Sequence, residues 1–171
     1  MGKAGEVIVV IGRQRSGKSP FIEWLRTQLG FENNVVFDRR GEYSDKNWSR
    51  FFSFESFKEF LFSDDCEGCL INIEEATAFI SGMKSLNMSD VLTGIAHNHN
   101  TMIVVFHSLA DAPQYILRLS SYIVLFPTND DPRTIKNSRS KLYPAFLSVN
   151  NPKRAKSKEG WNVPEIVDYN S

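Results

Sequence analysis

The chain has few cysteines, no long apolar run and no excess of either charge. Its 171 residues include two cysteines, and 20 Lys and Arg residues balance 20 Asp and Glu residues. This balance excludes a protein drawn to nucleic acid or membrane by its overall field, so any contact with a polyanion must be local. Apolar runs such as residues 7–11 and 102–106 are five residues long, whereas a membrane-spanning helix needs about 18 or more. We therefore expect no membrane span and no export leader, and an intracellular protein.

The two cysteines are too few for a metal site of their own. Cys66 and Cys69 form a single Cys-x-x-Cys with no second pair and no nearby His, so zinc would lack half of its ligands. Metal binding or redox chemistry is the less favoured interpretation. We expect two reduced thiols, with Cys69 entering a buried strand.

Short apolar runs alternate with longer helical patterns along the first 130 residues. Such alternation is typical of α/β proteins with a mostly parallel sheet flanked by helices. Strands are expected at residues 7–11, 35–38, 70–73, 101–106 and 122–126. Helices are expected at residues 20–29, around the apolar stripe of residues 54–61, at residues 89–96 with Ser89 as N-cap, and at residues 113–118.

The remaining residues form a basic extension with little periodicity. Residues 1–130 are predicted to form the core, and residues 131–171 an extension that packs on it or projects from it. Several prolines interrupt the extension, so we expect loops with one additional strand at residues 145–149. Residues 132–159 carry eight basic side chains against a single acid, Glu159: Arg133, Lys136, Arg139, Lys141, Lys153, Arg154, Lys156 and Lys158.

A phosphate-binding sequence follows the first strand. It matches G-x-x-x-x-G-K-[ST], with a strand before it and a helix after it. Glycines allow a tight turn whose backbone N–H groups face an anion, and the helix N-terminus adds positive potential. Lys18 would reach the β- and γ-phosphates of ATP, and the Ser19 hydroxyl group would bind Mg²⁺. The predicted nucleotide-binding residues are Gly12, Arg13, Gln14, Arg15, Ser16, Gly17, Lys18 and Ser19.

Two adjacent carboxylates follow the strand at residues 70–73. A nucleotide hydrolase needs one carboxylate for the magnesium ion and another to polarise the attacking water. We expect Glu74 to serve the metal and Glu75 to act on the water. The alternative is an acidic pair that only begins a solvated helix, where negative charge suits the helix dipole.

In these features the chain resembles the FtsK/HerA superfamily of P-loop motor ATPases, and within it the small genome-packaging ATPases of viruses with internal membranes. The resemblance rests on the P-loop, on the segment Asp-Arg-Arg-Gly-Glu-Tyr at residues 38–43, on Glu74-Glu75, and on residues 96–108 around the strand that ends before His107. It implies an additional-strand fold of the RecA/FtsK type, in which the strand before His107 lies between the P-loop strand and the acidic strand. It also implies that His107, where the family usually has Gln, faces the γ-phosphate. The alternative for His107 is a polar residue that only ends the strand.

The resemblance also implies an arginine that acts on a neighbouring subunit. Arg118 is the first candidate, followed by Arg133 and Arg139, because a guanidinium group supplied in trans stabilises the transferring phosphoryl group. For each of them the alternative is a surface arginine in a local ion pair.

The resulting hypothesis is an ATPase that drives double-stranded DNA into a preformed capsid. It would use ATP and Mg²⁺, work as a homo-oligomeric ring with hexamer and pentamer as the alternatives, contact capsid vertex proteins, and occur in the host cytoplasm or at the virion vertex. The basic extension could follow a DNA backbone without reading its sequence, although a solvated basic loop is the alternative. Two other functions stay open, namely a small P-loop kinase and a nucleotide-dependent phage assembly protein.

Overall fold

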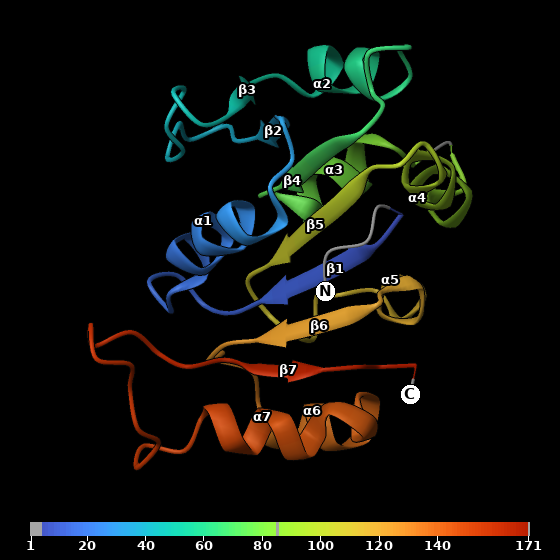
Figure 1. Ribbon diagram of the computed structural model, residues 1–171. Helices are drawn as coiled ribbons and strands as arrows, with labels where there is room; N and C mark the ends of the chain where they lie inside the picture. The colour runs from blue at the N-terminus through green and yellow to red at the C-terminus, as the bar shows by residue number, and fades with distance from the viewer. Residues whose placement is uncertain (1–4, 85, 171) are drawn as a thin grey trace.

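One seven-stranded sheet organises the chain. The computed structural model describes residues 5–84 and 86–170. The strand order is β3-β2-β4-β5-β1-β6-β7, with all pairs parallel except the last, so the arrow of β7 runs opposite to its neighbours in Figure 1. The strands are β1 Val7–Ile11, β2 Asn33–Phe37, β3 Ser49–Phe51, β4 Cys69–Ile73, β5 Thr101–Phe106, β6 Tyr122–Leu125 and β7 Glu165–Val167.

The strand order confirms the predicted fold class. All five expected strands are present, with ends shifted by at most two residues. β5 lies between the P-loop strand β1 and the acidic strand β4, which is the additional-strand arrangement. Each of β1, β4 and β5 is buried along its whole length, as expected for parallel strands that are covered on both faces.

Helices cover both faces of this sheet unequally. Ile22 and Leu25 of α1 pack on one face together with the loop that carries Tyr43 and Trp48. Buried residues of the other helices join the core on the opposite face. The helices are α1 Lys18–Leu29, α2 Phe54–Leu61, α3 Ala76–Gly82, α4 Met88–His97, α5 Gln114–Leu119, α6 Pro132–Ser138 and α7 Tyr143–Val149, with a short 3-10 helix, η1 Ser140–Leu142. Among the described residues, no helix is both long and apolar enough to cross a bilayer.

Local chemistry sets the ends of the helices. Gly30, in the left-handed region with φ 67°, ends α1 and donates its N–H to Arg26 O, which is the common C-terminal role of glycine. Helix α4 begins one residue earlier than expected. Its N-cap is Asn87, whose side chain accepts the Asp90 N–H, and so Ser89 is not the cap. The thiols of Cys66 and Cys69 are free and buried, and Cys69 begins β4.

The expected strand at residues 145–149 is wrong, because these residues belong to α7. Pro144 suits the first turn of a helix. Phe146 and Val149, three residues apart, are buried on one helix face against the sheet. The additional strand is β7 instead, and it pairs with β6 through Ile123–Val167 and Val124–Ile166. Residues beyond 131 therefore contribute two α-helices and one strand of the sheet.

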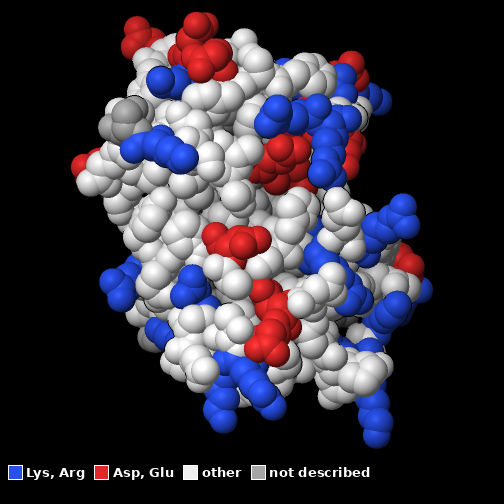
Figure 2. All heavy atoms as spheres, turned by 180° about the vertical axis from the view of Figure 1, so that it is seen from behind, with Lys and Arg blue, Asp and Glu red and all other residues white. Residues whose placement is uncertain are grey.

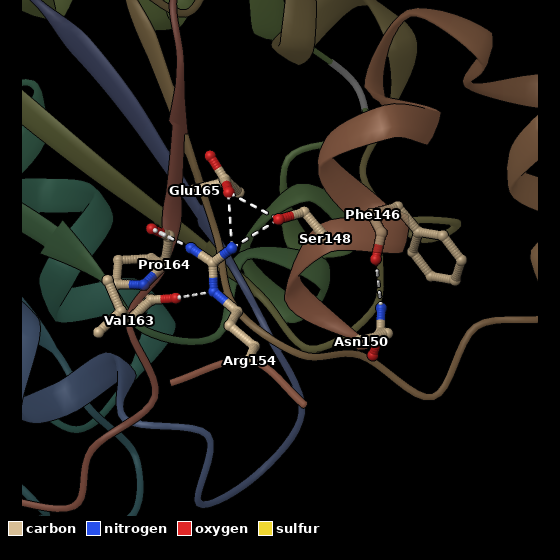
Figure 3. Close-up of polar contacts among 7 residues, drawn as sticks. All are labelled: Phe146, Ser148, Asn150, Arg154, Val163, Pro164 and Glu165. Carbon is tan, nitrogen blue, oxygen red and sulfur yellow. Dashed lines mark hydrogen bonds and ion pairs between the residues drawn. The ribbon is translucent and has the colours of Figure 1, made fainter. Parts of the chain in front are cut away.

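Arg154 ties the end of α7 to the residues that lead into β7 (Figure 3). Its guanidinium group donates to Glu165 Oε1 at 2.7 Å and to Ser148 Oγ at 2.5 Å. It also donates to the carbonyl oxygens of Val163 and Pro164, at 3.0 and 3.3 Å. The side chain is one-quarter exposed, and charge-assisted bonds of this kind are stronger than neutral ones. Arg154 therefore orders residues 163–165 rather than projecting into solvent.

We predict that Arg154→Ala lowers the free energy of unfolding by about 1–2 kcal/mol, because four acceptors, three of them part-buried, lose their donor. Lys153→Ala is the matched control. Lys153 is exposed, so its loss should change stability by no more than about 0.5 kcal/mol. Urea titration followed by circular dichroism measures both, and equal effects of the two substitutions would contradict a structural role for Arg154.

Candidate active site

The carboxyl ends of the parallel strands bring the predicted site residues to one edge of the sheet. The P-loop follows β1, Glu74 and Glu75 follow β4, and His107 follows β5. Open α/β sheets bind ligands outside this edge. Here it holds a cavity of about 470 Å³. The cavity is lined by Gln14, Arg15, Gly17, Lys18, Ser19, Pro20, Arg40, Glu42, Glu74, His107 and Trp161.

Glycine is required at two places in the P-loop. A Cβ at Gly12 would lie 2.6 Å from both Phe126 Cβ and Ser16 Oγ. Gly17, directly before α1, has φ 108° in the left-handed region, where other residues are strained. The chain can therefore turn tightly between β1 and α1 only with glycine at these positions.

Lys18 is buried and points back along the loop. Its Nζ donates to Gly12 O at 2.5 Å and to Arg13 O at 2.8 Å. Burial lowers the pKa of Lys18, while the nearby carboxylates of Glu74 and Glu42 act in the opposite direction. The ammonium group is thus held at the loop, where a phosphate chain would meet it.

Two further observations show that the loop suits an anion. The Ser16 hydroxyl group is buried and has no hydrogen-bond partner, which is uncommon for a buried polar atom. Arg13, Gln14 and Arg15 are exposed around the same turn. A nucleoside triphosphate therefore fits the positive charge of this loop and the unpaired hydroxyl group of Ser16.

Glu74 is buried at the floor of the cavity. Its Oε2 accepts the Tyr43 hydroxyl group at 2.8 Å. Burial raises the pKa of Glu74 to about 7, although the Tyr43 hydrogen bond and the Lys18 charge favour the ionised form. The same burial, together with the Glu74 charge, raises the pKa of Tyr43. A cation that replaced the lost hydration would keep Glu74 ionised.

The donor set around Glu74 fits magnesium rather than a protein-only metal site. Ser19 and Glu74 both line the cavity and offer hydroxyl and carboxylate oxygens, the ligands that Mg²⁺ prefers. No group of three or more His, Cys, Asp or Glu side chains that could hold a metal occurs in residues 5–84 and 86–170. Mg²⁺ usually takes few protein ligands and completes its shell with water and phosphate oxygens, so these residues fit such an ion.

Glu75 lies beside this cavity rather than within it. It lines a neighbouring cavity of about 310 Å³, and Arg40 and His107 line both. Glu75 Oε1 lies 3.6 Å from Arg40 Nε in an ion pair that is partly exposed. Glu74 directly follows β4, whereas Glu75 is the N-cap residue of α3 with φ −116° and ψ 67°, so the chain turns between them and the two side chains reach different cavities.

His107 is exposed where the two cavities meet. Partial burial, followed by the charges of Lys18 and Arg40, lowers the pKa of His107, and Glu75 and Glu42 oppose that shift. The imidazole is therefore neutral at pH 7, and it can offer one N–H donor and one acceptor.

The three candidate arginines lie in different settings. Arg118 is exposed at the end of α5, beside the amino end of β6 and so at the edge opposite the P-loop. Arg133 is exposed in the first turn of α6. Arg139 is partly buried, and its Nη2 donates to Ala112 O at 2.8 Å.

Two residues of the extension reach the P-loop without any signal in the sequence. Asn162 Nδ2 donates to Ser16 O at 2.9 Å, and Trp161 forms one wall of the cavity. These contacts span most of the chain, and neither residue lies in a recognisable motif. Tyr43 belongs to the segment at residues 38–43, but its hydrogen bond to Glu74 was not predicted.

The comparisons with known proteins bear on the fold. No family model matches the chain, and no curated protein sequence does so either. The strand order, together with the loop between β1 and α1, defines a P-loop NTPase fold of the additional-strand kind. RadB recombinase is similar at TM-score 0.52 and 14% identity, over 71% of this chain and 74% of that chain.

Two structures of a viral protein match almost the whole chain. The DNA-packaging ATPase B204 from Sulfolobus Turreted Icosahedral Virus has TM-score 0.68 and 17% identity, over 97% of this chain and 98% of that chain. The genome-packaging NTPase B204 from Sulfolobus turreted icosahedral virus 2, in complex with ATP-gammaS, has TM-score 0.68 and 16% identity, over 94% and 95%. The match includes the extension, so the fold is shared beyond the P-loop core.

We predict that Glu74→Gln stabilises the protein increasingly as the pH rises. The pKa of Glu74 is about 7 in the folded protein against an ordinary value of 4.5, so the folded state of the wild type favours the protonated acid. That contribution is complete below pH 4.5 and is lost as the pH rises through 7. We compare the free energy of unfolding of the variant with that of the wild type at each pH. This difference should be up to about 3 kcal/mol more favourable to the variant at about pH 8 than at low pH.

Urea titrations at several pH values without magnesium or nucleotide measure this difference. Glu159→Gln is the matched control, because Glu159 is exposed in the extension and its loss should matter by no more than about 0.5 kcal/mol. A Glu74→Gln difference that stays constant with pH would show that burial does not raise the pKa of Glu74.

Proposed function

We propose that the protein is an ATPase that packages double-stranded viral DNA into a preformed capsid. The observation that carries this proposal is the convergence of Lys18, Ser19, Glu74 and Glu75 at one edge of a sheet whose fold matches B204 along nearly its whole length. B204 is described as a DNA-packaging ATPase and has been solved with ATP-gammaS, which supports ATP as the nucleotide here.

The residues divide the hydrolysis between them. Lys18 and the loop N–H groups from Gln14 onward bind the β- and γ-phosphates, since the N–H groups of Gly12 and Arg13 already donate to Phe106 O and Pro127 O. Ser19 and Glu74 would hold Mg²⁺, which would neutralise charge on the phosphate oxygens. Glu75 accepts a proton from the water that attacks the γ-phosphorus, and ADP leaves with the electrons of the broken bond. His107, at the junction of the two cavities, contacts the γ-phosphate as a neutral donor.

Arg40 links nucleotide and base in this scheme. It pairs with Glu75 and also lines the P-loop cavity. A γ-phosphate would compete for the same guanidinium group, because Arg binds phosphate and carboxylate oxygens in similar geometry. Binding of ATP would thereby free Glu75 to take the proton.

We further propose a homo-oligomeric ring in which Arg118 of one subunit acts at the nucleotide of the next. Its guanidinium group is exposed at the edge opposite its own P-loop, so it is available to a neighbour. Arg133 is also exposed and is the second candidate. Arg139 is the weakest of the three, because it already donates to Ala112 O.

DNA would meet the edge of the sheet that carries the P-loop. Figure 2, seen from behind, shows Lys and Arg side chains gathered along the edge at right, which is the edge toward which β1 and β5 point in Figure 1. Arg13, Arg15, Arg39 and Arg40 are exposed in the loops after β1 and β2. Phosphate contacts of this kind bind DNA without reading its sequence.

The basic extension contributes less to this surface than its composition predicts. Arg139 and Arg154 bind within the protein. Lys141 Nζ donates to Tyr169 O and lies over the Tyr169 ring, 4.6 Å from its centroid. The exposed residues that remain as DNA contacts in this proposal are Arg133, Lys136, Lys153, Lys156 and Lys158.

The alternatives receive less support. A small kinase would need an acceptor pocket, whereas the carboxylates after β4 suit activation of water. A phage assembly protein that responds to nucleotide shares the P-loop but not the need for Glu75. Contact with capsid vertex proteins, in the host cytoplasm or at the virion vertex, belongs to the proposal.

We predict that Glu75→Gln retains ATP binding but lowers the hydrolysis rate by about a hundredfold or more, since a general base contributes at least that much. Lys18→Ala should lose both binding and hydrolysis. Calorimetry measures binding, and phosphate release measures turnover. If Glu75→Gln turns over normally, Glu75 is not the base.

Ring assembly and DNA dependence form a separate prediction. Phosphate release per subunit should rise with protein concentration and with added duplex DNA, and Arg118→Ala should bind ATP yet fail to hydrolyse it. Mixing Arg118→Ala with wild type should reduce activity more steeply than dilution alone. Lys84→Ala, which removes another exposed charge, is the control and should be inert. Turnover that depends on neither DNA nor concentration would contradict a translocating ring.

A further inference from the structure

We infer that residues 157–166 form the base-binding wall of the nucleotide site, and that the purine ring of the nucleotide stacks on Trp161. The inference rests on the proposed function and deepens it, because it names what holds the part of ATP that the P-loop does not reach.

An apolar groove continues directly from the P-loop cavity. It has a volume of about 510 Å³ and runs between α1 and the segment that leads into β7. Gly17, Pro20 and Trp161 line both the groove and the P-loop cavity, so a molecule whose phosphates lie in the loop can extend into the groove. The two spaces therefore form one continuous site with a charged half and an apolar half.

The groove gathers large apolar side chains that the fold leaves exposed. Trp24, Trp161, Val163 and Ile166 are each 40–52% exposed and all line it. Such a concentration of exposed apolar surface marks a binding site more often than chance. The rings of Phe21 and Phe126, 5.7 Å apart, form its floor. A flat aromatic ligand suits this lining, and the nearest such ligand to the P-loop is the base of the bound nucleotide.

Trp161 is held in place on both sides. Asn162 Nδ2 donates to Ser16 O at 2.9 Å, which fixes the following residue to the P-loop itself. Two hydrogen bonds join Trp161 to Ser157. Ser157 N donates to Trp161 O at 2.8 Å, and Trp161 N donates to Ser157 Oγ at 3.1 Å. Beyond them, Arg154 holds Val163 O, as Figure 3 shows. The backbone of Trp161 is therefore already held beside the P-loop, so that binding a base has to order little more than the indole side chain, which favours binding.

Stacking on Trp161 predicts that the affinity for ATP depends on the indole, whereas the affinity for the phosphate chain alone does not. A stacked base loses roughly 5- to 150-fold in affinity when the aromatic side chain is replaced by alanine. A ligand without a base loses nothing by the same change. Inorganic tripolyphosphate has the phosphate chain of ATP without sugar or base, so it separates the two halves of the site.

The experiment compares binding of ATP and of tripolyphosphate to the full-length chain by calorimetry. Trp161→Ala should bind ATP about tenfold more weakly and tripolyphosphate as the wild type does, and Trp161→Phe should recover most of the ATP affinity. Phe62→Ala is the matched control, because Phe62 is 56% exposed far from the groove in sequence and does not line it; both ligands should bind it normally. Lys18→Ala should lose both ligands.

The results distinguish the inference from the function on which it rests. If Lys18→Ala loses ATP but Trp161→Ala does not, the nucleotide site stands and the base lies elsewhere. An equal loss of both ligands in Trp161→Ala also overturns the inference, since Trp161 would then only support the loop. If the wild type binds neither ligand, both the site and the inference fail. Unchanged ATP affinity with altered sedimentation of Trp161→Ala would assign the groove to a second copy of the chain.

Discussion

The parallel alignment of the central strands is the constraint on which the candidate site depends. Because β1, β4 and β5 run in the same direction, the segments that follow them meet at one edge, although they lie far apart in the sequence. β5 separates β1 from β4, so His107 lies between the P-loop and the carboxylates. The complete burial of these strands stabilises the arrangement through apolar contacts.

A second constraint arises at the end of β4, where the two acidic residues separate. Glu74 turns toward the P-loop and is buried against Tyr43, whereas Glu75 turns toward Arg40 and is partly exposed. Burial disfavours the charged form of Glu74 and also that of Lys18, and the hydrogen bonds that the protein gives them do not replace the lost hydration. The site therefore carries an electrostatic cost in the folded protein that a phosphate chain with its cation would relieve.

Features that depend on a local pattern of residues could be predicted from the sequence, whereas features that depend on contacts between distant segments could not. Continuous apolar runs revealed the five long strands, and the P-loop motif is itself local. β3 and β7 are three residues long, too short for periodicity to detect. Residues 145–149 have the apolar composition of a strand, but Pro144 and the spacing of Phe146 and Val149 fit a helix. Trp161 and Asn162 reach the P-loop only after the sheet has been assembled, so no pattern near them shows the contact.

The bond from Asn162 to Ser16 joins residues that are 146 positions apart, and this separation has a kinetic consequence. Closing so long a loop is slow and costs chain entropy that earlier contacts must offset. The P-loop turn is made by residues close together in the sequence, whereas its far wall, Trp161 and Asn162, depends on the segment that leads into β7. The complete pocket therefore requires both ends of the polypeptide to be in their native places, and tight nucleotide affinity would report that this topology has been reached.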